Sequence, residues 1–159
     1  MTRRPVYQIE FHPDVAKDVA VLQHRAKADP GDHTSRNLLT VANNVIREIQ
    51  CGHPGTHDLV FMPSYPDLSD CRTNYVGADP DRKPSHRIVW RELPPTSPDA
   101  LPRRQILVLG ERCDGQAYHM AGQRLARPHG VRLTDLRRAP EPVAADPSPV
   151  RSADRQPGD

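Results

Sequence analysis

The segment that most constrains the fold is Gln105-Ile106-Leu107-Val108-Leu109, in which four apolar residues follow one glutamine and Gly110 ends the run. A continuous apolar run of this length is typical of a central strand that is buried on both faces. The rest of the chain must therefore supply neighbouring strands and the layers that cover the sheet.

Two amphipathic helices are predicted in the first third of the chain. Pro13 suits the first position of a helix over about 13–27, and apolar residues follow it at helical spacing. A second helix over about 35–51 carries a broad apolar stripe, and Gly52 is a favourable stop for it. Adjacent helices of this kind form an antiparallel hairpin, whose apolar faces need a sheet to cover.

Three further strands and a last helix complete the predicted order. The strands are expected at about 6–11, 71–76 and 86–92, before the central one, and the helix at about 116–127. This order predicts an α+β fold. We expect a small twisted antiparallel sheet packed against the N-terminal helical hairpin, with a short C-terminal helix.

The C-terminal segment differs from the rest in composition. We expect residues 1–128 to form one domain and residues 129–159 to form a disordered tail, in which Pro, Arg, Asp and Ala dominate without an apolar period. The chain has 18 prolines and only 36% hydrophobic residues, which agrees with a part outside any core. The tail is therefore expected to make no packed contacts.

Charge is distributed unevenly along the chain. Residues 72–127 carry ten Lys/Arg against six Asp/Glu, whereas residues 1–71 carry seven against nine. A basic half fits a face turned toward an anion such as a nucleic acid, although a solvated basic surface explains it equally well. The three cysteines do not indicate a disulfide framework, and no apolar run suits export or a membrane span. We expect a cytoplasmic protein without membrane contact.

Arg87, Arg112 and Tyr118 are the candidate catalytic residues. If the strands around Arg87 and before Arg112 pair as a meander, both guanidinium groups lie near one end of a sheet face, where Tyr118 can approach them. Arginine binds phosphate oxygens in bidentate fashion, and a phenol exchanges protons if cations lower its pKa from about 10. Alternatively, the arginines decorate a solvated face and the tyrosine belongs to the core.

A metal site is a weaker interpretation of the histidines and cysteines. Cys51, His53, His57 and Cys71 share one stretch, but Cys-x-His spacing is too tight for a usual structural zinc pair, so a polar loop is preferred. Cys113 has no His or Asn partner pattern that marks a nucleophile. No metal or cofactor is expected.

Three stretches together resemble a known family. They are Tyr7–Asp18, His86–Arg91 and Val108–Leu125, the last of which contains Gly-x-Arg and then a tyrosine six residues after the arginine. The chain from residue 6 to about 127 thereby resembles the RelE/ParE toxins of type II toxin–antitoxin systems. The resemblance implies a cognate antitoxin as partner and a ribosome-dependent endonuclease that cuts mRNA in the ribosomal A site.

The resemblance also implies roles for residues. In metal-free cleavage a ribose 2′-hydroxyl attacks the adjacent phosphate: Tyr118 transfers a proton, Arg112 stabilises the phosphorane and Arg87 holds the phosphate. Further RNA contacts are expected from Arg72, Arg82, Lys83, Arg91 and Arg124. One departure is that Thr73 and Tyr75 stand where RelE carries two lysines. The alternatives are a ParE-like inhibitor that binds DNA gyrase without catalysis, and a catalytically degenerate member that binds only its antitoxin.

Overall fold

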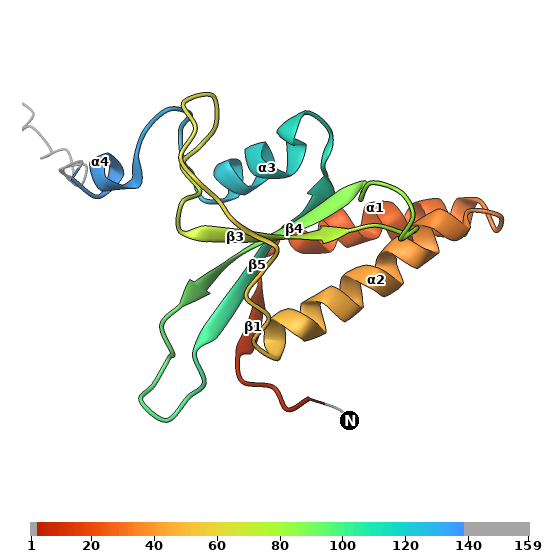
Figure 1. Cartoon of the computed structure of the whole chain (residues 1–159), viewed down its shortest axis with the longest axis horizontal. Coiled ribbons are helices and arrows are strands. Elements are labelled where there is room, and N and C mark those ends of the chain that lie inside the picture. The colour runs from red at the N-terminus through yellow and green to blue at the C-terminus, as the bar shows by residue number, and fades with distance from the viewer. Residues whose placement is uncertain (1–2, 139–159) are drawn as a thin grey trace, which may run out of the picture.

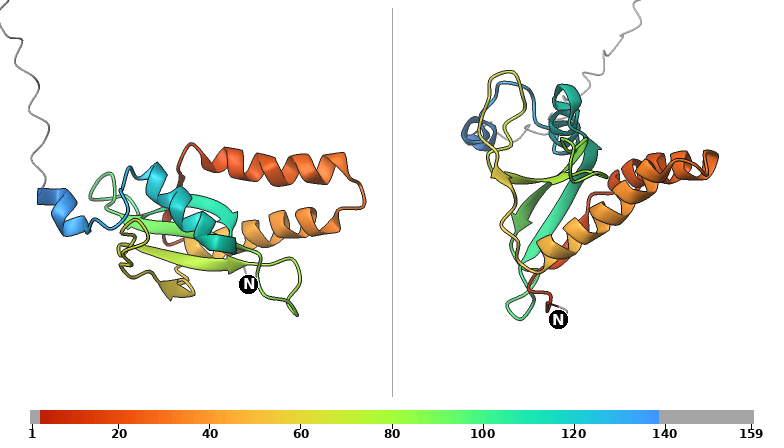
Figure 2. Two further views of the ribbon diagram at one scale, coloured as in Figure 1. Left: turned by 90° about the horizontal axis from the view of Figure 1, so that it is seen from above. Right: turned by 45° about the vertical axis from the view of Figure 1, so that its right-hand side comes forward.

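The computed structural model describes residues 3–138 and has an α+β fold, as predicted. A five-stranded sheet lies between a helical hairpin on one face and a short helix on the other (Figures 1 and 2). The hairpin comprises α1 (Val15–Ala28) and α2 (His33–Gln50), and the short helix is α3 (Gln116–Arg124). In sheet order the strands are β1 (Gln8–Phe11), β5 (Arg103–Glu111), β4 (His86–Leu93), β3 (Cys71–Val76) and β2 (His57–Asp58).

The sheet is mixed, which corrects the prediction of an antiparallel sheet. β2, β3, β4 and β5 pair in antiparallel fashion, but β1 pairs in parallel with the first half of β5, from Gln8 opposite Arg103 to Phe11 opposite Ile106. The apolar segment is a buried inner strand, as predicted, and β1 occupies its outer edge. The sequence did not predict the direction of β1 relative to β5. The helical hairpin follows β1 and determines the end of the sheet at which the chain re-enters it.

The hairpin helices match the predicted ranges within two residues. α2 begins at His33 because the Asp32 carboxylate caps it, accepting a hydrogen bond from the backbone N–H of Ser35 at 2.9 Å. A bulge between Val89 and Trp90 shifts the β4–β5 register. Because of this bulge, Ile106 and Val108 face opposite sides of the sheet although they are two positions apart: Ile106 packs toward the hairpin and Val108 toward α3.

A buried ion pair replaces the missing strand partner along the second half of β5. The Asp18 carboxylate of α1 accepts from the N–H of Leu109 at 3.0 Å, and the Arg124 guanidinium of α3 donates to the carbonyl of Leu107 at 2.8 Å. Arg124 also binds both oxygens of Asp18. This pair joins α1, β5 and α3 and satisfies the backbone where β1 ends.

The prediction for the tail is wrong for residues 129–138. Gly130 N donates to the carbonyl of Tyr65, and Leu133 N donates to the buried carboxylate of Asp67 at 2.8 Å. Residues Leu133–Arg138 form a further helix, α4. Composition did not predict the contacts of residues 129–138 because most of them are hydrogen bonds, which need no apolar periodicity. Residues 139–159 lie outside the described part of the chain. Within residues 3–138, no helix is long and apolar enough to cross a membrane.

Candidate phosphodiester site

The three candidate catalytic residues come together on the sheet face that α3 covers. Arg87 of β4 lies opposite Tyr75 of β3 and Gly110 of β5. Its Cζ is 4.4 Å from the centre of the Tyr118 ring and 5.5 Å from that of Tyr75. The Cζ of Arg112 is 5.6 Å from the Tyr75 ring. The Tyr75 ring is therefore close to both cations.

Short local devices place Arg112 and Tyr118. The N–H of Arg112 donates to the carbonyl of Ser85 at 2.8 Å and extends the β4–β5 pairing by one step. A 3-10 turn over Cys113–Gly115 then reverses the chain, and α3 begins at Gln116 with Tyr118 in its first turn. Because the link between β5 and α3 is short, Tyr118 is held close to Arg87 and Arg112.

Arg87 is a buried cation without an anionic partner among residues 3–138. Its residue is 8% exposed, and its Nε finds no acceptor. Within residues 3–138, neither Arg87 nor Arg112 forms an ion pair with a carboxylate. Burying an uncompensated charge is costly, so such a group is suited to receive an anion.

The environment of Tyr118 contradicts the expected lowering of its pKa. Burial raises the pKa of the phenol, and the positive charges of Arg87 and Arg112 oppose this effect without outweighing it. The phenol is therefore protonated at neutral pH. It can donate a proton in this site, but it is not available as a base.

Two of the predicted RNA contacts have structural roles instead. Arg124 is the buried partner of Asp18 described above. Arg72 projects from the opposite face of the sheet, where it stacks over Trp90 and pairs with Asp58 at 3.0 Å. Residue spacing suggested these two arginines as RNA contacts, but it could not show on which face of the sheet each one lies or with which residue it pairs.

The other three predicted contacts lie outside the central cluster. Arg91 lies four residues beyond Arg87 on β4, about 13 Å away along the strand, and its Nε donates to Gln105. Arg82 and Lys83 are exposed in the loop between β3 and β4, where the Nε of Arg82 is 3.7 Å from a carboxylate oxygen of Asp79. These loop residues are accessible to a nucleic acid, whereas Arg91 is at the other end of the strand.

A cavity beside the cluster was not foreseen from the sequence. It has a volume of about 240 Å³, and its aromatic walls are His57, Tyr65 and Tyr118, with Leu59, Val60 and Leu68 as aliphatic ones. The His57 ring lies 5.4 Å from that of Tyr75 in an edge-on arrangement, and Tyr65 lies edge-on to Tyr118 at 6.1 Å. Two residues of the cavity wall thus contact the aromatic rings of the arginine cluster.

Two glycines, Gly115 just before α3 and Gly122 within it, let the loop that contains Tyr65 and Pro66 approach α3 closely. A Cβ on Gly122 would lie 2.1 Å from Pro66 Cγ, and one on Gly115 would lie 2.5 Å from the Tyr65 ring. Gly115 also has φ of +64°, which disfavours other residues. The loop is further held by an Arg127–Asp70 ion pair. No local sequence signal could reveal this, because the partners are about 50 residues apart.

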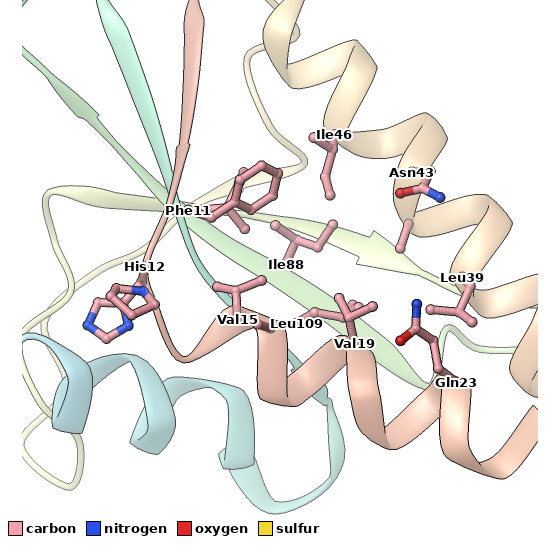
Figure 3. Close-up of a pocket in the computed structure, with 14 residues that line it drawn as sticks. Phe11, His12, Val15, Val19, Gln23, Leu39, Asn43, Ile46, Ile88 and Leu109 are labelled. Carbon is pink, nitrogen blue, oxygen red and sulfur yellow. The ribbon is translucent and has the colours of Figure 1, made fainter.

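A second hollow lies on the opposite side of the sheet, between α1 and α2 (Figure 3). This hairpin groove has a volume of about 760 Å³. Val15 and Val19 point into it from α1, and Leu39 and Ile46 from α2. Phe11, at its end, is 54% exposed. A groove of apolar side chains between two helices suits an apolar segment of a partner better than a polar ligand.

Comparison of the chain with protein-family models, with curated proteins and with solved structures finds no match. The functional argument therefore depends on the geometry and chemistry of the site.

Proposed function

We propose that this protein is an RNA-cleaving toxin of the RelE/ParE kind, which acts in the cytoplasm on mRNA in the ribosomal A site. The observation that carries the proposal is Arg87, a buried cation beside Tyr118 for which residues 3–138 provide no carboxylate. Arg112, which also has no carboxylate partner among residues 3–138, adds a second cation near Tyr75. Two guanidinium groups with a phenol match the charge and shape of a phosphodiester in its transition state.

In the proposed reaction the two arginines bind the scissile phosphate. Attack by the 2′-hydroxyl puts additional negative charge on the phosphate oxygens, and fixed cations in a partly buried site stabilise this charge without reorganisation. Arg87 is held between two aromatic rings, so its orientation is set before the substrate binds. Arg112 is partly exposed and approaches from the end of β5.

Tyr118 is assigned as the proton donor to the leaving 5′-oxygen. This assignment uses the raised pKa of the phenol, since a group that remains protonated at neutral pH can act as a general acid. It specifies the proton-transfer role that the resemblance implies for Tyr118 as that of a donor. The products are a 2′,3′-cyclic phosphate and a 5′-hydroxyl.

The proposal is tested by induced expression of the full chain followed by mapping of mRNA ends. Wild-type protein should arrest growth and leave cuts within codons, whereas Arg112→Ala should do neither. Arg47→Ala, an exposed change on α2, is the matched control and should behave as wild type. Intact mRNA together with DNA damage would indicate a gyrase inhibitor, and growth without either effect would indicate a degenerate member.

The partner that we propose is an antitoxin protein with an amphipathic helix. The groove between α1 and α2 offers an apolar surface, and Phe11 is exposed at its end. Phe11→Asp should weaken capture of the antitoxin and leave RNA cleavage unchanged, because the groove and the arginine cluster lie on opposite faces of the sheet. Val21→Asp, at an exposed α1 position outside the groove, should retain the antitoxin.

A further inference from the structure

The site as described lacks a group that accepts the proton of the 2′-hydroxyl. Tyr118 is protonated and the arginines are always charged, so none of the three serves as a base. Positioned proton acceptors contribute about 10²–10⁴-fold in rate. A nuclease of this kind therefore requires one more residue close to the cluster.

His57 is the side chain whose position suits this role. It lies in β2 opposite Thr73, so its side chain is on the same sheet face as Tyr75 and Arg87. Its ring contacts Tyr75, and it lines the cavity that Tyr118 also lines. Imidazole is the side chain that changes charge between pH 5 and 8, so it can accept a proton at neutral pH.

The other titratable groups around this cavity are less suitable. The Asp58 carboxylate is paired with Arg72, which projects from the other sheet face. Tyr65 is a second phenol, packed on Gly115. Histidines are also present behind Tyr65, but His119 stacks on its ring at 4.8 Å and shares a 3.3 Å ring-nitrogen contact with His129. Neither of these two lines the cavity.

We propose that His57 is the general base of the RNA cleavage, paired across the cavity with Tyr118 as general acid; this rests on the proposed function. A ring nitrogen of His57 takes the proton of the 2′-hydroxyl as the 2′-oxygen bonds to phosphorus. The bond from phosphorus to the 5′-oxygen breaks, and that oxygen takes the proton of Tyr118. Proton exchange with water then restores both residues. The titratable groups around His57 are Tyr75, which its ring contacts, and Asp58, Tyr65 and Tyr118, which line the cavity with it.

The test is single-turnover cleavage by the full chain on ribosomes programmed with a short mRNA, followed from pH 5.5 to 9. His57→Gln keeps the backbone bonds of β2 and should lower the rate at pH 7 by about 100-fold or more. It should also remove the rise in rate between pH 5 and 8. Added imidazole should restore cleavage by His57→Ala, which leaves space for it, and should not restore cleavage by Arg112→Ala.

Two matched histidine variants serve as controls. His24→Gln, at an exposed α1 position, and His119→Gln, behind Tyr65, should keep both the rate and the pH dependence. If wild type cleaves and His57→Gln retains its rate and pH profile, the assignment of His57 is wrong but the nuclease proposal stands. If wild type cleaves no RNA, both are wrong. Thermal melting of each variant shows whether a loss of rate comes from unfolding.

Discussion

Arg87 and Arg104 are both buried between two aromatic rings, on opposite faces of one sheet, but their surroundings differ. Arg104 is 3% exposed, with its Cζ 3.8 Å from the Tyr7 ring and 4.4 Å from the Trp90 ring. Its terminal nitrogens donate to the carbonyls of Ile49 and His53 and to the Glu92 carboxylate. Arg87 is almost as buried, and the Nε of each arginine lacks an acceptor, but within residues 3–138 the terminal nitrogens of Arg87 have no carbonyl or carboxylate partner.

The difference separates an arginine that holds the fold from one that is suited to a ligand. On the hairpin face, the protein itself compensates the buried charge and joins α2, β4 and β5 through one side chain. On the α3 face, stacking orients the guanidinium, but residues 3–138 supply no anion that compensates its charge. Burial alone therefore does not distinguish the two roles; the acceptors do.

The largest expected effect is on cleavage by Arg87→Met. Loss of a positioned cation should lower the single-turnover rate by about 100- to 1,000-fold. Because methionine replaces an uncompensated buried charge, the free energy of unfolding should be unchanged or raised by about 1 kcal/mol. Rate and urea unfolding are measured on the same preparation. A clear loss of stability would show that Arg87 is structural, like Arg104.

Arg104→Met should have the opposite profile. The carbonyl of His53 loses its guanidinium donor, and the carbonyl of Ile49 keeps only backbone donors such as Gly52 N, which should lower the free energy of unfolding by about 1–3 kcal/mol. The rate of the folded fraction should remain near that of wild type, since Arg104 is on the other face of the sheet. Urea unfolding and an activity titration at low temperature measure the two quantities. If Arg104→Met left the unfolding midpoint unchanged, Arg104 would not be structural and the contrast with Arg87 would be contradicted.

Deletion of residues 129–159 should affect mainly the α3 face. It removes the N–H of Leu133 from the buried Asp67 carboxylate and the Arg132 side chain from the Phe61 ring, so the loop that forms the small cavity loses support. We expect a loss of about 1.5–3 kcal/mol in the free energy of unfolding. Deletion of residues 139–159 alone preserves these contacts and is the control. Equal melting temperatures for the two truncations would contradict the role of residues 129–133.

The smallest effect concerns acid stability of the same loop. Burial raises the pKa of Asp70, but the hydrogen bonds and charge of Arg127 outweigh it and hold the pKa below its ordinary value of 3.8. A lowered pKa in the folded state contributes stability above that value, and this stability is lost as pH falls through the lowered pKa. Asp70→Asn should therefore cost about 0.5–1 kcal/mol at pH 7. The difference from wild type should disappear at the acid end of a series of denaturant titrations.

Much of the secondary structure follows from local patterns. The apolar spacing of α1 and α2 and the apolar run of β5 are properties of neighbouring residues, so sequence reasoning located these elements within a few positions. The convergence of Arg87, Arg112 and Tyr118 was also predicted, because a meander of two strands followed by a helix constrains their positions.

The sequence by itself determined the α+β order of elements and the arginine–tyrosine cluster, because hydrophobic periodicity and short connections are encoded locally. Only the tertiary structure decided the parallel pairing of β1, the structural role of Arg124, the raised pKa of Tyr118 and the place of His57 beside Tyr75. These depend on which side of the sheet a residue faces and on partners far along the chain. Such contacts depend on the packing of the whole domain and have no local signature.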